Sequence, residues 1–277
     1  MRGLHARDID VGDGLHLHIV SAGAGAPLVL LHGFTGSATT WAPLRDALGD
    51  RVATLAVDLP GHGASGAPGD PDRYALGSLA GDLTRVLDAF GVGRAAVLGY
   101  SLGARAALRF ALDHPARVAA VVLESVSPGI VDAAERAARR ASDAALADDI
   151  EREGIAAFVD RWERLPLWAS QHALAPAARA ELRAQRLANR PQGLANSLRG
   201  AGAAADAPVV ERLATLRVPA LLVAGALDAK YVAIGRMMEQ TMPRAQLRVV
   251  ANAGHAVHLE QPAAFAALVA EFLDAPR

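Results

Sequence analysis

Val97-Leu98-Gly99-Tyr100-Ser101-Leu102-Gly103-Ala104-Arg105 is the stretch that decides the fold of this chain. The apolar run over residues 95–98 predicts a strand, and residues 104–112 have the apolar spacing of a helix. Glycine on each side of Ser101 lets strand and helix approach closely, so the serine hydroxyl stands on a sharp turn beyond the sheet edge. This pattern predicts a nucleophile or a base. A surface serine in a glycine-rich loop is the alternative, and the decision depends on partners elsewhere in the chain.

Composition limits the classes of function to consider. The chain has 277 residues and a formal net charge of −1, with both signs mixed along it. This balance argues against nucleic acid or an anionic membrane as a partner. The sequence has no cysteine, which removes disulfides and thiolate chemistry. We find neither a basic-then-apolar leader nor an apolar run of the roughly 18 residues that a membrane span needs. We therefore expect a cytoplasmic protein without a membrane span.

The order of the apolar segments indicates an α/β fold. After a hairpin over residues 8–20, continuous apolar runs that are typical of buried parallel strands alternate with segments of helical spacing. Such alternation requires right-handed crossovers and predicts a mainly parallel sheet with helices on both faces. The predicted strands of this sheet cover residues 27–31, 52–57, 95–98, 118–123, 218–225 and 246–250.

The strand pattern stops for about 80 residues in the second half of the chain. Residues 125–206 are rich in alanine, arginine and glutamate, have helical spacing and are broken at Pro166, Pro176 and Pro191. A helical insertion between two strands of a sheet predicts a cap over the site, where it would exclude water and carry substrate-binding side chains. We therefore expect a core domain over residues 1–124 and 207–277, with residues 125–206 as its cap.

Three polar residues follow predicted strands and together suggest a catalytic triad. Ser101, Asp228 and His255 each stand just past the end of an apolar run. The carboxyl ends of parallel strands meet at one sheet edge, where open α/β sheets bind their ligands. A neutral imidazole can take a proton from the serine hydroxyl, and a buried carboxylate can hold the ring in the required tautomer. We therefore predict Ser101, Asp228 and His255 as the catalytic residues.

Other polar residues near strand ends have weaker claims to a catalytic role. Asp58 follows a strand but precedes the serine, and its proline- and glycine-rich loop explains it as a turn residue. We expect His32 and His62 to hold their loops rather than to transfer protons. The pattern His-x-x-His-x-Glu over residues 255–260 could mimic a metal site. The helical His-Glu-x-x-His arrangement is missing, so we expect no bound metal.

With these motifs, the chain resembles the α/β-hydrolase superfamily over nearly its whole length, which implies an eight-stranded, mostly parallel sheet flanked by helices and a helical cap. In that fold the loop after the first central parallel strand and the residue after the nucleophile supply the oxyanion hole. By resemblance these are the backbone N–H groups of Phe34 and Leu102. More narrowly, the chain is similar to the 2-succinyl-6-hydroxy-2,4-cyclohexadiene-1-carboxylate synthases of menaquinone biosynthesis. Ala104 departs from the second glycine usual in that family. The stretches that carry the narrower resemblance are residues 32–41, 57–65, 99–105, 127–143, 162–166, 225–231 and 254–262.

The resemblance implies a lyase rather than a hydrolase. The family's reaction eliminates pyruvate from a ring substrate that carries three carboxylates, with the serine as a histidine-activated base. Arginine binds carboxylates bidentately, and Arg105 stands one helical turn past the serine. Arg139 and Arg186 match the family's other carboxylate-binding arginines, although a solvated helix face is the alternative for each. Tyr100 and Trp162 are expected to line the pocket. The resemblance implies no metal or organic cofactor.

Three other functions compete with the lyase. A serine esterase would use the same triad covalently and would form a trappable acyl-enzyme. A carbon–carbon hydrolase of ring-cleavage products is related, but its substrates do not require three arginines. A receptor-like protein with this fold would bind a signalling molecule without turning it over. An intact catalytic triad argues against that function. The sequence does not indicate an oligomeric state, and a small molecule is the only partner that it suggests.

Overall fold

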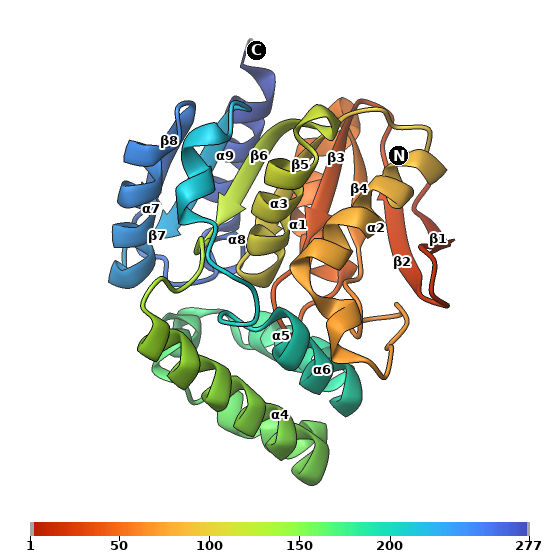
Figure 1. The fold of residues 1–277 in the computed structure, drawn as a ribbon. Coiled ribbons are helices and arrows are strands. Elements are labelled where there is room, and N and C mark those ends of the chain that lie inside the picture. The colour runs from red at the N-terminus through yellow and green to blue at the C-terminus, as the bar shows by residue number, and fades with distance from the viewer. Residues whose placement is uncertain (1–2, 276–277) are drawn as a thin grey trace.

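The computed structural model describes residues 3–275 and contains one eight-stranded sheet (Figure 1). The strand order in the sheet is β1-β2-β4-β3-β5-β6-β7-β8. The first two strands pair antiparallel, as does β2 with β4, and all the remaining neighbours are parallel. The predicted eight-stranded, mostly parallel sheet is confirmed. Its strands are β1 (His5–Asp10), β2 (His16–Ala22), β3 (Ala26–Leu31), β4 (Val52–Val57), β5 (Ala95–Tyr100), β6 (Val118–Glu124), β7 (Ala220–Gly225) and β8 (Ala245–Val250).

Helices cover both faces of the sheet, which explains why its central strands are apolar on both sides (Figure 1). One hydrophobic core lies between the sheet and α2, α3 and α7, and a second lies between the opposite face and α1, α8 and α9. Every residue of β5 and of β7 is buried. The helices around the sheet are α1 (Ala42–Leu48), α2 (Leu76–Ala89), α3 (Leu102–Asp113), α7 (Ala229–Thr241), α8 (Val257–Glu260) and α9 (Pro262–Asp274), with short 3-10 helices η1 (Ala38–Trp41), η2 (Gly49–Arg51), η3 (Pro71–Tyr74), η4 (Pro115–Arg117) and η6 (Val210–Thr215).

A helical insertion separates β6 from β7 and lies beyond the carboxyl ends of the parallel strands (Figure 1). It consists of α4 (Ala133–Trp162), the 3-10 helix η5 (Pro166–Ala173), α5 (Pro176–Leu187) and α6 (Pro191–Ala201). Each of the three prolines that interrupt the pattern begins a helix, because the fixed φ of proline suits the first helical position, whose N–H has no partner. The insertion has its own apolar core, in which Phe158, Ile150 and Leu194 are fully buried.

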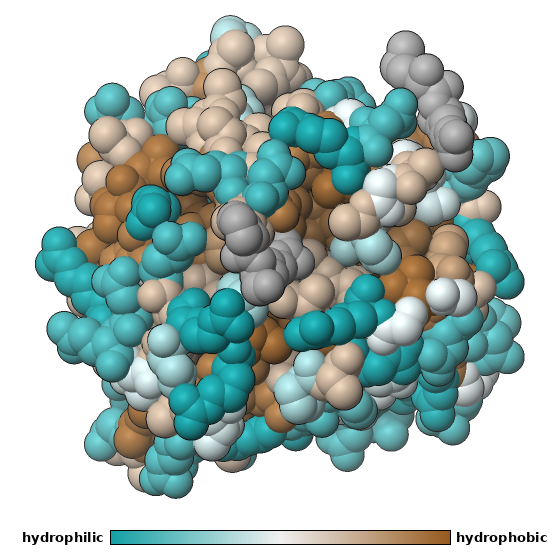
Figure 2. Space-filling view, turned by 90° about the horizontal axis from the view of Figure 1, so that it is seen from above, coloured by the Kyte–Doolittle hydropathy of each residue, from teal (hydrophilic) through white to brown (hydrophobic). Residues whose placement is uncertain are grey.

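The surface of the molecule mixes polar and apolar residues. Figure 2 views the end opposite the insertion, where hydrophilic side chains break up the hydrophobic ones. The large exposed apolar side chains, among them Leu4, Val131, Leu227 and Val249, come from separate parts of the chain. Within residues 3–275, no helix is both long enough and apolar enough to cross a membrane.

Candidate active site

Ser101 occupies the turn between β5 and α3 in a backbone conformation that few residues other than glycine adopt. Its φ is 51° and its ψ is −105°, and such strain persists only where the surroundings enforce it. A Cβ atom at Gly99 would lie 2.2 Å from the Gly103 carbonyl oxygen, and one at Gly103 would lie 2.2 Å from that of Leu31. Both glycines are therefore required for the turn, and the turn lifts the Ser101 hydroxyl out of the sheet edge.

Ser101, His255 and Asp228 form one hydrogen-bonded chain. The distance from His255 Nδ1 to Asp228 Oδ2 is 2.7 Å, and that from His255 Nε2 to Ser101 Oγ is 3.1 Å. The side chain of His255 is 3% exposed. Because the carboxylate can only accept, Nδ1 carries the proton and Nε2 is left to accept from the serine hydroxyl. This is the arrangement in which an imidazole can take the serine proton.

Two residues that line the cavity beside the serine, Phe34 and Leu102, have backbone N–H groups without an acceptor among residues 3–275. Leu102 is the first residue of α3, so its N–H has no acceptor within the helix. Phe34 lies in the loop after β3, and its N–H has no hydrogen-bond partner among residues 3–275. Gly33 permits this loop to pass close to Tyr100, the residue before the serine, since a Cβ there would lie 2.6 Å from the Tyr100 ring. Unpaired donors at this position could stabilise a developing oxyanion.

The triad opens into a cavity of about 150 Å³ between the sheet edge and the insertion. Its wall contains most of the residues that sequence reasoning assigned to a site: Phe34, Tyr100, Ser101, Leu102, Arg105, Arg139, Trp162 and His255. Asp228 lies behind His255 and also caps α7 by accepting from the Tyr231 N–H. We call this cavity the triad pocket. It is lined from both the sheet edge and the insertion.

Two arginines and one carboxylate, that of Asp143, line the triad pocket and give its wall a net positive charge. The Arg105 guanidinium donates to the carbonyls of Gly202 at 2.9 Å and Ala201 at 2.6 Å, and burial lowers its pKa. Arg139 donates to Asp143 through Nε at 2.9 Å, which leaves its terminal nitrogens without a hydrogen-bond partner among residues 3–275, and its side chain is 45% exposed. Both arginines therefore line the wall of the pocket beside the serine.

Arg186 lies outside the triad pocket, contrary to the expectation from the sequence. Its Nη1 donates to Glu163 at 3.0 Å, its Nη2 donates to Gln171 at 2.9 Å, and the guanidinium lies 5.5 Å from the Trp168 ring centroid. The side chain is 7% exposed. The placement of α5 turns this arginine toward the interior of the insertion, where its positive charge is paired with the Glu163 carboxylate.

His32 and His62 hold loops, as the sequence suggested. His32 is fully buried, donates through Nδ1 to the Gly33 carbonyl at 2.7 Å and accepts at Nε2 from the Leu59 N–H at 3.0 Å. Burial lowers the pKa of His32 to about 4. His62 donates to the Pro60 carbonyl at 3.0 Å, and burial together with the neighbouring His32 lowers its pKa to about 3. Both rings are therefore neutral near pH 7 and fix the loops around Phe34.

A buried network that sequence reasoning missed joins the serine turn to the histidine loop. The Glu124 carbonyl accepts from the Ser101 N–H at 2.9 Å, and its carboxylate accepts from His258 Nδ1 at 2.9 Å. The Ser125 hydroxyl donates to the His255 carbonyl at 2.8 Å. Glu260 accepts from the N–H groups of Gly254 at 2.6 Å and Ala256 at 3.2 Å, on either side of the histidine. The His-x-x-His-x-Glu pattern therefore serves this network, and no metal-binding cluster occurs in the described part of the chain.

Comparison with known proteins gives a consistent picture. The family model for the alpha/beta hydrolase fold matches residues 26–262. A Bacillus subtilis protein named "Putative 2-succinyl-6-hydroxy-2,4-cyclohexadiene-1-carboxylate synthase" is 40% identical over 96% of this chain and 97% of its own length. A Klebsiella pneumoniae synthase of the same name is 34% identical over 89% of this chain and 93% of its own. The solved structure of MenH from S. aureus aligns with a TM-score of 0.88 at 32% identity, covering 91% of this chain and 96% of that one.

Proposed function

The chain belongs to the α/β-hydrolase fold family and to the family of 2-succinyl-6-hydroxy-2,4-cyclohexadiene-1-carboxylate synthases, and from this membership we propose the reaction that it catalyses. It is a carbon–oxygen lyase that eliminates pyruvate from 2-succinyl-5-enolpyruvyl-6-hydroxy-3-cyclohexene-1-carboxylate. The product is 2-succinyl-6-hydroxy-2,4-cyclohexadiene-1-carboxylate. The observation that carries the proposal is a serine–histidine–aspartate chain that faces a pocket with two arginines in its wall.

In this mechanism Ser101 acts as a base rather than as a covalent nucleophile. His255, oriented by Asp228, accepts the hydroxyl proton while the serine oxygen removes a ring proton that the adjacent succinyl ketone acidifies. The N–H groups of Phe34 and Leu102 stabilise the enolate oxygen, and loss of one such donor costs about 3–4 kcal/mol of barrier. The electron pair moves through the ring and breaks the carbon–oxygen bond. The enolate of pyruvate leaves and takes up the proton that the Ser101–His255 pair had accepted, which gives pyruvate and restores the enzyme, so that no acyl-enzyme forms and no cofactor is needed.

The walls of the triad pocket suit an anionic ring substrate. Arg105 and Arg139 bind substrate carboxylates, since guanidinium forms paired hydrogen bonds with them. Tyr100 and Trp162 pack against the ring, and burial raises the pKa of Tyr100 well above its usual value, so this phenol stays neutral. A neutral ester needs no such charges. The arginines thus favour the lyase over a carboxylic-ester hydrolase.

Residues 125–206 act as a cap in this proposal, and residues 1–124 and 207–277 form the core domain. The cap contributes Arg139 and Trp162 to the pocket and excludes water from the enolate. A protein without cysteine suits a reducing compartment, and we place the reaction in the cytoplasm.

A coupled assay of pyruvate release from the enolpyruvyl precursor tests the proposal. We expect turnover that falls by a factor of about 10³ or more in Ser101→Ala, because the base is lost. Aryl esters should be cleaved slowly and should leave no acyl group on the serine. Fast ester cleavage with a trappable acyl-Ser101 and no pyruvate would assign the chain to the esterases instead.

A further inference from the structure

Tyr231 lines the triad pocket, and the mechanism above makes no use of it. It lies in the first turn of α7, where its backbone N–H donates to Asp228 Oδ1 at 3.3 Å. Its ring meets the His255 ring at an angle of 64°, with 4.6 Å between the two centroids. These contacts hold the Tyr231 ring beside the catalytic histidine.

The hydroxyl of Tyr231 is free to bind a ligand. It has no hydrogen-bond partner among residues 3–275. The side chain is half-buried, and its oxygen keeps surface that solvent can reach, unlike Trp162 Nε1 in the same wall. A phenol of this kind can donate one hydrogen bond. The pocket therefore contains a donor that the chain itself leaves unpaired.

The Tyr231 hydroxyl lies on the side of the pocket that carries the arginines. Burial raises the pKa of this phenol, and the charges of Arg105 and Arg139 oppose the rise, Arg105 more strongly. In return, the ionised phenol acts more strongly on the Arg105 guanidinium than the Asp143 carboxylate does. Charges interact more strongly at shorter distances, so these effects place the hydroxyl beside Arg105. The phenol is neutral near pH 7 and keeps the proton that it can donate.

Tyr100 differs from Tyr231 in its surroundings, although both line the pocket. Burial and the Glu124 carboxylate raise the pKa of Tyr100, and the arginine that opposes the rise is Arg186. Its phenol therefore lies nearer to the Glu124 side of the site than to Arg105. Tyr231 is the tyrosine whose hydroxyl can share a ligand with Arg105.

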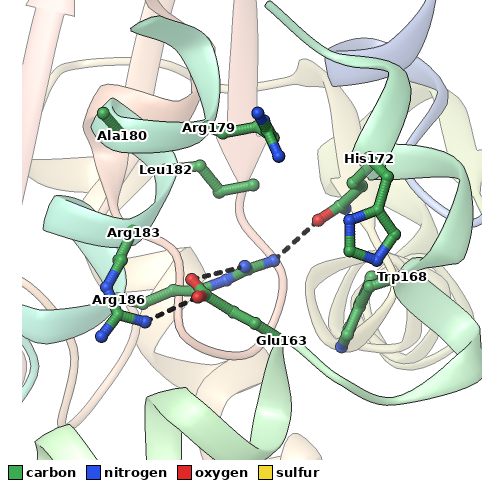
Figure 3. Close-up of a pocket in the computed structure, with 9 residues that line it drawn as sticks. Glu163, Trp168, His172, Arg179, Ala180, Leu182, Arg183 and Arg186 are labelled. Atoms are coloured by element: carbon green, nitrogen blue, oxygen red, sulfur yellow. Dashed lines mark hydrogen bonds and ion pairs between the residues drawn. The ribbon is translucent and has the colours of Figure 1, made fainter. Parts of the chain in front are cut away.

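The pocket has fewer arginines than the proposed substrate has carboxylates. Arg105 and Arg139 line it, whereas Arg186 lies beside Glu163 inside the insertion and pairs with that carboxylate (Figure 3). Arg105 also gives an N–H group from each terminal nitrogen to a backbone carbonyl. The two oxygens of a carboxylate can accept about four hydrogen bonds. A carboxylate at Arg105 therefore has room for a further donor, and the Tyr231 hydroxyl is next to it.

We propose that Tyr231 is a substrate-binding residue, whose hydroxyl donates to a substrate carboxylate that Arg105 also binds. Hydrogen bonds to a charged acceptor are stronger than those to a neutral one, so this hydroxyl favours carboxylates over neutral groups of the same shape. The identity of the substrate rests on the lyase function proposed above, whereas the preference for a carboxylate does not.

Titration calorimetry of the full chain with 2-succinylbenzoate tests this role. The compound is a stable aromatic dicarboxylate with the same two carboxylate-bearing groups as the proposed product. Tyr231→Phe removes the hydroxyl and keeps the ring that packs on His255, and we expect Kd to rise by about tenfold or more. Tyr74→Phe is the matched control, because its hydroxyl donates to the Pro68 carbonyl at 3.0 Å outside the pocket. This control should bind 2-succinylbenzoate as the parent does.

A neutral ligand shows whether the charge matters. The diamide of 2-succinylbenzoate keeps the shape and loses both charges, so it should bind to the parent at least about tenfold more weakly. Equal affinity for the diamide would overturn the proposal. An unchanged Kd for 2-succinylbenzoate in Tyr231→Phe, an equal loss in Tyr74→Phe, or no saturable binding to the parent would also overturn it.

Kinetics of pyruvate release separates this role from the lyase assignment. Tyr231→Phe should raise KM by about tenfold and change kcat only a few-fold. A parent that releases no pyruvate, with the calorimetric loss still present in Tyr231→Phe, would keep the carboxylate-binding role and refute the lyase alone. Pyruvate release with parent values of KM and Kd in Tyr231→Phe would keep the lyase and refute the role of Tyr231. A fall in kcat with an unchanged Kd would refute that role too, since Tyr231 would then support His255 and not the substrate.

Discussion

Arg105 has two tasks, and they can be separated by experiment. Its guanidinium faces the triad pocket while it donates to the carbonyls of Gly202 and Ala201 at the end of α6. It therefore links the helix after the serine to the insertion, and its position is fixed before any substrate arrives. A pre-ordered guanidinium loses little side-chain entropy when it binds a carboxylate.

Arg105→Ala should lower kcat/KM for the tricarboxylate substrate by a factor of about 100 or more, since a charge-assisted bidentate contact disappears. The rate with a neutral aryl ester should change only a few-fold. Steady-state kinetics with both substrates measures the difference. Arg105→Lys keeps the charge but not the paired geometry, so it should recover part of the loss. Equal losses on both substrates would mean that this arginine serves the scaffold and not the carboxylates.

The neutral buried histidines make stability depend on pH. In the folded chain the pKa of His32 is about 4 and that of His62 is about 3, whereas an unfolded histidine titrates near 6.5. Below pH 6.5 the unfolded state therefore binds more protons, and the free energy of unfolding falls as the pH drops toward 4. We expect a loss of about 2 kcal/mol per histidine between pH 7 and pH 5.

Urea unfolding at the two pH values measures this slope. His62→Gln should lose stability at pH 7 but should show a smaller difference between pH 7 and pH 5 than the parent. His16→Gln, which changes an exposed histidine at the start of β2, provides the control and should keep the parent slope. An unchanged slope in the His62 variant would contradict the depressed pKa.

Among the secondary-structure elements, the position of a residue at the end of a strand is easier to predict from sequence than the direction in which a helical residue faces. Ser101 and Asp228 follow continuous apolar runs and His255 follows the more polar strand β8, and the topology of a parallel sheet brings such strand ends to one edge whatever the loops do. The orientation of a helix in the insertion depends on packing against its neighbours, because α5 is exposed on most of its surface. For this reason the sequence could not show that Arg186, which the resemblance implied as a carboxylate-binding residue, pairs with Glu163 and packs on Trp168 within the insertion.

The network around His255 could not be predicted from local sequence either. Glu124 and His258 lie 134 positions apart, and only the adjacent placement of β6 and the histidine loop brings them together. The one local signal was a glutamate at the end of a wholly apolar strand, where a buried carboxylate needs a partner. Sequence reasoning treated the strand as apolar and the histidine as part of a metal-like pattern.

Glu260 acts on catalysis through the backbone beside His255. It accepts from the N–H groups on both sides of the histidine, and Glu260→Gln removes one of these acceptors. We expect kcat to fall by a factor of about 10 to 100 with little change in KM, because the imidazole turns away from the serine while the pocket keeps its arginines. The pH profile of kcat should shift as well, since the contact with Asp228 loosens.

Kinetics across pH distinguishes this positioning role from a general loss of stability. Glu271→Gln, an exposed residue on α9, is the matched control and should behave as the parent does. A Glu260 variant with a raised KM and the parent pH profile would show that the carboxylate supports the pocket rather than the histidine.

At the scale of the whole molecule, the insertion is attached to the core by α5 and α6. Gln185 donates to Ser37 at 3.0 Å, and Asn189 donates to the Thr35 carbonyl at 2.9 Å. Two glycines also approach each other closely, because a Cβ at Gly193 would lie 2.1 Å from the Gly61 carbonyl oxygen. These contacts hold α6 against the core, and its last carbonyls hold Arg105. The triad pocket therefore depends on the seating of the insertion.

Gly193→Ala should lift α6 from the core, since its new methyl group meets backbone that cannot move aside. We expect KM for the tricarboxylate to rise by about tenfold or more as the arginines lose their positions, whereas Ser101 should still react with a small fluorophosphonate at near the parent rate. Steady-state kinetics with the tricarboxylate measures KM, and a time course of Ser101 phosphonylation measures the rate with the fluorophosphonate.

Gly69→Ala is the matched control, because the nearest atom to its new methyl group is a side-chain nitrogen at 3.9 Å. It should leave both readings unchanged. If Gly193→Ala lowered the fluorophosphonate rate as much as the turnover, the triad itself would depend on the insertion. The core domain would then not hold the catalytic residues in place without the insertion. The proposed division into a core over residues 1–124 and 207–277 and a cap over residues 125–206 would be wrong. If neither reading changed, the contact between α6 and the core would be irrelevant to substrate binding.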